Sequence, residues 1–307
     1  MTRLLATALV ALAFPLAAAE PAPEHPEKPM LWKVEGKDLA EPSWLFGTIH
    51  IGQGPIATLH PAAERALESS DALYTEVPMD MATQLGLATA FIRKDGKTLT
   101  ESIGAELATQ LDTELRAISP VLSSKGLNSF KTWAVAVTVP MLKLQLQGGE
   151  ALDSIVWKKA SKAGLKTGAL EKPADQFGIF DGLTEKEQVS LLAETLRLQK
   201  EARTQGEDPI DALVDAYVAG DDEQLGAEME KQFREMAEGE HAELGKKLMK
   251  QLLDDRNVDM ARTIVRLLGE EPGKSHFFAV GSGHYIGKGN IGELLTREGY
   301  TVTRVTE

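Results

Sequence analysis

The sequence of 307 residues contains no cysteine and only six histidines. The absence of cysteine excludes disulfides, cysteine-ligated zinc, iron–sulfur clusters and thiol nucleophiles. A metal site would therefore have to use histidine, aspartate and glutamate. Positive charge is also scarce, because 33 Lys and Arg residues are outnumbered by 46 Asp and Glu residues and the formal net charge is −13. A nucleic-acid partner is not expected, since binding through phosphate contacts needs the opposite charge.

Long hydrophobic runs are absent after the N-terminus. Residues 1–19 contain Arg3, an apolar run from Leu4 to Leu16 and a small-residue ending at Ala19, a pattern typical of a cleaved secretory signal peptide rather than an anchor helix. We expect an exported protein, periplasmic or extracellular, without a stable membrane span in the mature chain. Residues 20–29 form a Pro-rich leader, and the sequence does not indicate an oligomeric state.

The remaining chain, 43% hydrophobic and 26% charged over the whole sequence, has the composition of a globular protein. Short strands are predicted near both ends and helices fill the middle, where one short strand interrupts them. The predicted strands are Met30–Val34, Trp44–Ile51, Ala72–Val77, Leu165–Leu170, Phe277–Gly281 and Tyr300–Val305. The fold class is α/β (α+β): a single domain over residues 30–307 has a central mixed sheet from the N- and C-terminal parts of the chain and a large helical insertion over about 81–268.

Two segments repeat one motif, an apolar strand that runs into Gly-x-x-His. The first ends in Gly47 and His50, and the second in Gly281 and His284. Glycine at a strand end permits a sharp turn, and the carboxyl edge of such a sheet is where ligands bind. Glu76 ends a third apolar strand, where an acid is costly unless it is paired or ligated. Two histidines and one carboxylate that converge there form a candidate metal site with open positions.

Arg256 lies within the apolar stripe of a helix predicted over Glu240–Leu268. A guanidinium in such a stripe needs an anion, and the acids at strand ends are Glu76 and Glu171. The alternative is that Arg256 extends along the helix edge into solvent.

Taken in order along the chain, these segments resemble the TraB/GumN family, relatives of the Tiki metalloproteases in a superfamily with ChaN-like haem-binding proteins and erythromycin esterases. The matching segments are Leu31–Val34, Ser43–His50, Tyr74–Glu76, Gly149, Leu152-Asp153, Ala160, Gly164, Leu170-Glu171, Arg256-Asn257, Val280–His284 and Gly299–Val302. The resemblance implies a metal-dependent hydrolase fold in which His50, His284 and Glu76 hold the ion.

The leading hypothesis is an exported metal-dependent hydrolase, most simply a peptidase, that acts on a peptide or small-molecule substrate. A divalent ion (Mn, Co or Zn) and its water would be held by His50, His284 and Glu76. Arg256 would orient a carboxylate or stabilise an oxyanion, and Glu171 would support these groups or act as general base. One alternative is a non-catalytic protein that binds haem or a peptide in the same cleft. Another is a metal-independent esterase that uses His and Glu as acid–base groups.

Overall fold

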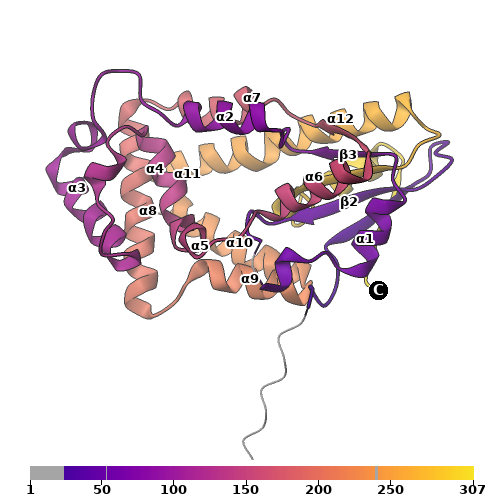
Figure 1. Ribbon diagram of the computed structural model, residues 1–307, viewed down its shortest axis with the longest axis horizontal. Helices are drawn as coiled ribbons and strands as arrows, with labels where there is room; N and C mark the ends of the chain where they lie inside the picture. Colours follow the sequence, from indigo (N-terminus) through magenta and orange to yellow (C-terminus); the bar gives the residue numbers. More distant parts are fainter. Residues whose placement is uncertain (1–23, 53, 239–240) are drawn as a thin grey trace, which may run out of the picture.

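The computed structural model describes residues 24–52, 54–238 and 241–307 (Figure 1). The predicted signal peptide, residues 1–19, and the first residues of the Pro-rich leader, 20–23, lie outside the described residues. Across the described ranges, no helix is both long enough and apolar enough to cross a membrane.

Six strands form one mixed sheet in the order β4-β3-β5-β2-β1-β6. The strands are β1 Leu31–Glu35, β2 Ser43–Thr48, β3 Ala72–Thr75, β4 Lys166–Ala169, β5 His276–Gly281 and β6 Thr301–Val305. β1 pairs antiparallel with both of its neighbours, whereas β4, β3, β5 and β2 are mutually parallel. The predicted mixed sheet is confirmed, and its edge strand β4 comes from the helical middle of the chain. The carboxyl ends of four adjacent strands therefore meet at one rim.

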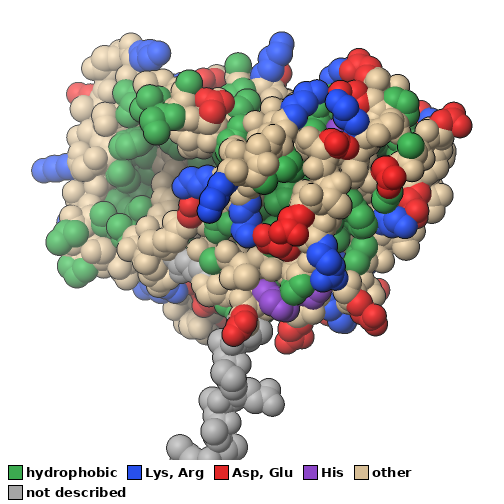
Figure 2. Space-filling model, turned by 45° about the vertical axis from the view of Figure 1, so that its right-hand side comes forward, with side chains coloured by type: hydrophobic (Ala, Val, Ile, Leu, Met, Phe, Trp, Pro, Cys, Tyr) green, Lys and Arg blue, Asp and Glu red, His purple; other side chains and the backbone are tan. Residues whose placement is uncertain are grey.

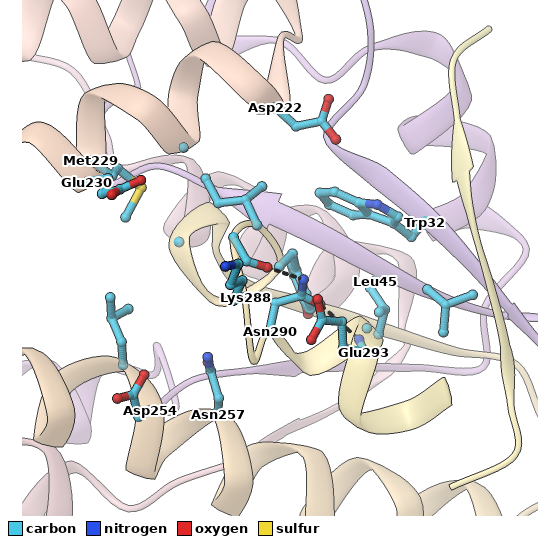
Figure 3. A pocket seen from close by; sticks show the side chains of 18 of the residues that line it. Trp32, Leu45, Asp222, Met229, Glu230, Asp254, Asn257, Lys288, Asn290 and Glu293 are labelled. Atoms are coloured by element: carbon cyan, nitrogen blue, oxygen red, sulfur yellow. Dashed lines mark hydrogen bonds between the residues drawn. The ribbon is translucent and has the colours of Figure 1, made fainter. Parts of the chain in front are cut away.

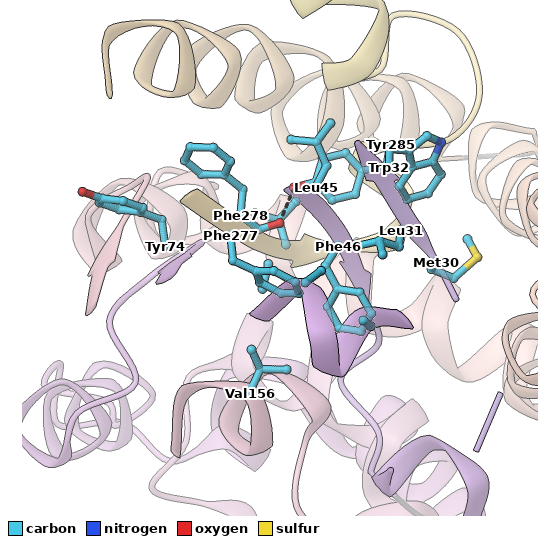
Figure 4. Close-up of a cluster of buried hydrophobic side chains, with 14 of the residues drawn as sticks. Met30, Leu31, Trp32, Leu45, Phe46, Tyr74, Val156, Phe277, Phe278 and Tyr285 are labelled. Carbon is cyan, nitrogen blue, oxygen red and sulfur yellow. Dashed lines mark hydrogen bonds between the residues drawn. The ribbon is translucent and has the colours of Figure 1, made fainter. Parts of the chain in front are cut away.

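Side chains of the central strands alternate between two covered faces of the sheet (Figure 4). Phe46 and Phe277 point toward Val156 of α6 (Leu152–Ala163), and Leu45 and Phe278 point to the opposite face. That opposite face packs against α12 (Asp255–Glu270) and α13 (Ile291–Arg297). Burial of both faces explains why the sequence of β5 is a continuous apolar run instead of an alternating one.

Three of the other helices, α1 Pro61–Glu68, α9 Pro209–Ala219 and α10 Asp222–Ala237, add buried residues to the hydrophobic cluster of the sheet. A lobe beside the sheet contains most of the rest (Figure 1). The remaining helices are α2 Met81–Ala90, α3 Leu99–Ile118, α4 Thr132–Thr138, α5 Leu142–Gln147, α7 Pro173–Asp181, α8 Glu185–Gln205 and α11 Ala242–Met249. Leucines of α3 and α8, including Leu111, Leu115 and Leu192, form a second hydrophobic cluster with Val135 and Leu248. The lobe thus has its own core. Acidic and basic side chains are interspersed over the face shown in Figure 2.

The helix predicted over Glu240–Leu268 runs without a loop from Ala242 to Glu270, but it contains one irregular turn. α11 is followed by a π-helical turn, Lys250–Asp254, and then by α12, while Glu240 lies outside the described residues. The wider turn carries the chain one residue further before Arg256, whose Nη1 donates to the Leu252 carbonyl over 3.1 Å. π-turns of this kind occur frequently at functional sites.

Candidate active site

Four candidate residues follow the carboxyl ends of the four parallel strands. Glu171 comes after β4, Glu76 after β3, His284 after β5 and His50 after β2. The predicted strand that carries His50 ends at Thr48, so His50 lies in the loop beyond it. The sheet order therefore places the two acids on adjacent strands and the two histidines on the next two.

The first glycine of each Gly-x-x-His motif allows the motifs to approach one another and Glu76. A Cβ on Gly47 would lie 2.9 Å from Ser282 Oγ, and one on Gly281 would lie 3.1 Å from Glu76 Oε1. Ser282 Oγ donates to the Thr48 carbonyl over 2.8 Å. The Gly281 amide donates to Glu76 Oε1 over 2.7 Å. These glycines are needed for close contact between strand ends.

Glu76 is held in its ionised form. Its Oε2 accepts hydrogen bonds from Arg256 Nη2 at 2.5 Å and from Gln176 Nε2 at 2.9 Å, and the side chain is only 7% exposed. Burial opposes ionisation, but His284, Arg256 and His50 together with the Gly281 amide hold the pKa of Glu76 well below its usual range. Glu76 therefore carries a negative charge at neutral pH.

Arg256 clamps the two acids together, as the helical pattern predicts. Its Nε donates to both carboxylate oxygens of Glu171, at 3.0 and 3.1 Å, and its Nη2 bridges Glu171 and Glu76. Burial raises the pKa of Glu171, although Arg256 opposes the shift. The alternative, a solvent-exposed Arg256 at the helix edge, is wrong. Since most of its N–H groups are occupied, the guanidinium acts mainly as a clamp in this arrangement.

His284 is buried and neutral. Asn257 donates its Nδ2 to the Gly289 carbonyl, so its Oδ1 is the atom that faces His284 Nδ1 at 2.7 Å. Nδ1 then carries the ring proton, and Nε2, 3.9 Å from Glu76 Oε1, keeps its lone pair. Burial, with smaller contributions from Arg256 and His50, lowers the pKa of His284 to about 4 against the influence of Glu76.

His50 is the open and cationic member of the pair. Its Nδ1 lies 2.9 Å from Asp153 Oδ2, and the other carboxylate oxygen of Asp153 accepts a hydrogen bond from Thr48 Oγ1 at 2.5 Å. The charge of Asp153 and the hydrogen bond between His50 and Asp153 raise the pKa of His50 to about 9. The His50 side chain is 64% exposed, whereas Asp153 is 2% exposed. The His50 ring is thus open to solvent, while the buried Asp153 holds its Nδ1.

The site is completed by three residues to which the sequence pattern gave no role: Asp153, Asn257 and Gln176. Asp153 and Asn257 belong to segments that carry the family resemblance, but sequence reasoning gave them no role. A signal was present, since each lies at helical spacing from buried apolar residues, as Arg256 does. Gln176 lies one turn into α7 and gives no such signal.

The remaining histidines lie outside this rim. His60 accepts from the Ala62 amide as the N-cap of α1, and His25 packs edge-on against it. His276 opens β5 beside Glu271, and His241 precedes α11. Asp221 caps α10, because its side chain accepts a hydrogen bond from the Gln224 amide. These placements agree with structural roles.

The donors at the rim are suited in kind to a divalent metal. Each histidine has its Nδ1 fixed by an acceptor and its Nε2 free, the arrangement seen in metal-ligating histidines. Glu76 Oε1 has one hydrogen-bond donor and a remaining lone pair. Within the described part of the chain, no three His, Asp or Glu side chains are close enough to hold an ion together. The ligand assignment therefore depends on donor chemistry.

Fold and site define a class of protein: an α/β protein that gathers two histidines, two glutamates and an arginine at the carboxyl edge of a mixed sheet. The chain belongs to the TraB/PrgY/gumN family, whose model matches residues 30–304. The predicted family membership is confirmed.

Curated relatives of the chain include metalloproteases. The chain is 24% identical to Metalloprotease TIKI1 of Danio rerio over 91% of its own length, 24% to Metalloprotease TIKI2 of the same species over 89%, and 25% to Metalloprotease TIKI1 of Homo sapiens over 85%. These matches span 64%, 60% and 59% of the relatives' own lengths. No solved structure matches the chain.

Proposed function

We propose that this protein is a metal-dependent hydrolase that acts on peptide bonds. The observation that supports this most is the rim itself: two histidines, each with Nδ1 fixed and Nε2 free, follow the two strands next to the strand that carries the ionised Glu76. The relatives reported above are named metalloproteases, which agrees with that chemistry.

In this proposal, His50, His284 and Glu76 hold a divalent ion, with Mn, Co or Zn as candidates. When bound, such an ion would lower the pKa of a bound water and polarise a carbonyl group. His284 is already neutral and presents Nε2. His50 must lose a proton from its ring before Nε2 can bind, and Asp153 keeps that ring oriented by retaining the Nδ1 hydrogen bond.

Arg256 and Glu171 support the site in different ways. Arg256 neutralises the charge that two adjacent carboxylates would otherwise build up, and so keeps Glu76 ionised. Glu171 accepts three contacts from Arg256 and fixes its plane. We assign Glu171 to positioning Arg256, and one N–H of Arg256 Nη1 remains for a developing oxyanion.

The test is metal analysis of the purified protein combined with a peptide-hydrolysis assay. We expect stoichiometric metal, loss of metal and activity in His284→Ala, and retention of both in His241→Ala, which removes a histidine outside the rim. Chelation should abolish hydrolysis, and the added metal should restore it. A metal content that is the same in both variants would contradict the proposed ligands.

A metal-independent acid–base hydrolase is a second candidate, favoured by one observation. A cationic His50, a neutral His284 and an ionised Glu76 lie at one rim, and together they could donate and accept protons. Hydrolysis that survives complete chelation would favour this candidate. A Soret absorption band in the purified protein would instead favour haem binding.

We also propose that the protein is exported, on the basis of residues 1–19 alone. N-terminal sequencing of protein recovered from outside the cytoplasm should begin near Glu20. An intact Met1 on that material would contradict cleavage.

A further inference from the structure

A cavity of about 1140 Å³ opens beside the candidate active site and shares two lining residues with its framework. Asn257, which fixes His284, and Gly283, which precedes it, both line the cavity. His50, Glu76, His284 and Arg256 do not line it. The cavity is thus a separate space, divided from the reactive side chains by the turn that carries His284.

The floor of the cavity is apolar. Trp32 and Leu45 contribute from the sheet, Met229 from α10, Leu253 from the π-helical turn and Ile286 from the loop after β5. In Figure 3, the labelled side chains from these elements surround one open space. Displacement of water from such a floor by an apolar group lowers the free energy of the system.

The rim of the cavity is predominantly acidic. Its charged residues are the acids Asp222, Glu223, Glu230, Asp254 and Glu293 and the bases Lys288 and Arg297. Three of the acids have partners: Glu293 lies 3.5 Å from Arg297, Glu230 lies 3.3 Å from Arg234, and Asp222 lies 3.6 Å from Arg304. Glu223 and Asp254 remain, with Lys288 as the other cation of the rim. No ion pair joins Glu223 or Asp254 to any other residue that the structure describes. An apolar ligand that carries positive charge would therefore match both the floor and the rim.

We infer that this cavity binds a peptide segment in which apolar side chains alternate with Lys or Arg. The volume exceeds that of a typical drug-sized site, so several side chains of a segment fit together. Apolar side chains occupy the floor between Trp32 and Met229, and the cationic ends reach Glu223 and Asp254. This binding site is distinct from the proposed hydrolytic site and does not depend on hydrolysis.

Calorimetric titration with two matched peptides tests the inference. The probes are acetyl-Leu-Lys-Leu-Lys-Leu-amide and the same peptide with Glu in place of Lys. EDTA is present throughout, so that metal-dependent cleavage does not contribute. We expect the Lys peptide to bind at least about fivefold more tightly than the Glu peptide, with an affinity that falls as salt rises. Equal affinities, or no binding of the Lys peptide, would overturn the inference.

Variants locate the binding. Ala227→Trp places a bulky side chain into the cavity from the exposed surface of α10 and should abolish binding. The double variant Glu223→Gln with Asp254→Asn should weaken the Lys peptide by about fivefold and leave the Glu peptide no weaker. Glu106→Gln, on α3 in the helical lobe, is the matched control and should change neither. Circular dichroism confirms that each variant is folded, and full affinity in folded Ala227→Trp would place the peptide elsewhere.

Discussion

Two histidines with the same Gly-x-x-His spacing are held in opposite protonation states, because each has a different neighbour at Nδ1. Asp153 places a full negative charge beside His50, whereas Asn257 offers His284 a neutral amide oxygen. The first ring is open to solvent and cationic at neutral pH, and the second is buried and neutral. Single atoms in the supporting residues thus set the charge of the rim.

Asp153→Asn should lower the pKa of His50 from about 9 toward 6.5, because the substitution removes the charge but keeps an oxygen for Thr48. A raised pKa in the folded state stabilises the protein below pH 6.5, and this contribution is lost as pH rises through 9. The variant should therefore lose most stability below pH 6.5. NMR titration of the His50 ring measures the shift, with Glu64→Gln as a surface control. An unchanged midpoint would contradict the assigned cause.

Glu76, Glu171 and Arg256 form a buried trio in which two acids share one guanidinium. Removal of the cation would leave two carboxylates close together without a counter-charge, whereas removal of one acid would leave a balanced pair. Arg256 is therefore the member whose loss should cost most.

Arg256→Ala should destabilise the fold by roughly 3 kcal/mol, since it leaves buried charges unpaired. Arg256→Lys should also lower stability, because an ammonium cannot reproduce the planar fork that meets Glu171 through Nε and Nη2. Urea unfolding measures both changes. Arg262→Ala, an exposed change on the same helix, is the control, and an unfolding midpoint of Arg256→Ala that equals the control's would refute the clamp.

The pairing of Arg256 could be predicted from the sequence, but its geometry could not. A charged residue on an apolar helical stripe predicts a buried partner of opposite charge, and the acids at strand ends, Glu76 and Glu171, were the candidates. The pattern did not show that one guanidinium would serve both acids. The role of Asp153 was missed although it lies on a similar stripe, because its partner His50 lies 103 positions away along the chain.

At the scale of elements, two local features aim the site residues. The π-helical turn before α12 inserts one residue into the helix that carries Arg256 and Asn257. The loop after β2 packs so closely on the segment before α6 that a Cβ on Gly52 would lie 1.5 Å from the Glu150 carbonyl oxygen. This contact brings the loop that carries His50 against the start of α6, where Asp153 lies.

Gly52→Ala should therefore destabilise the protein by roughly 1–3 kcal/mol, as overpacking against backbone does. It should also loosen the His50–Asp153 contact and so lower the pKa of His50. Gly178→Ala in α7 is the control, since a Cβ there meets no atom within 4 Å. Thermal unfolding compares the stabilities of the two variants. Equal stability would show that the loop shifts to accommodate the added methyl group at little cost.

Element ends were predictable where a terminator is encoded in the chain. α6 ends at Gly164, which takes a left-handed conformation, and α9 begins at Pro209. The π-helical turn after Met249 was not predictable, because no Pro or Gly marks it. The residues that follow the turn make tertiary contacts: Met260 and Ile264 pack in the core, and Arg256 meets its two acids.

At the scale of the whole molecule, two hydrophobic clusters share one helical rod. Leu248 at the end of α11 belongs to the cluster of the helical lobe, and Met260 in α12 belongs to the cluster under the sheet. Because the rod continues through the π-helical turn without a loop, we expect both clusters to unfold together. The prediction of a single domain over residues 30–307 likewise implies one cooperative unfolding transition.

Leu192→Ala tests that expectation, because it creates a cavity only in the helical lobe. The change should cost about 2–5 kcal/mol, as buried Leu-to-Ala substitutions do. In a cooperative molecule, hydrogen exchange should show the same loss of protection in β5 of the sheet as in α8, whereas Lys200→Ala on the exposed side of α8 should alter neither. Loss of protection confined to α8 and its neighbours would mean that the lobe unfolds by itself and that the chain contains two units.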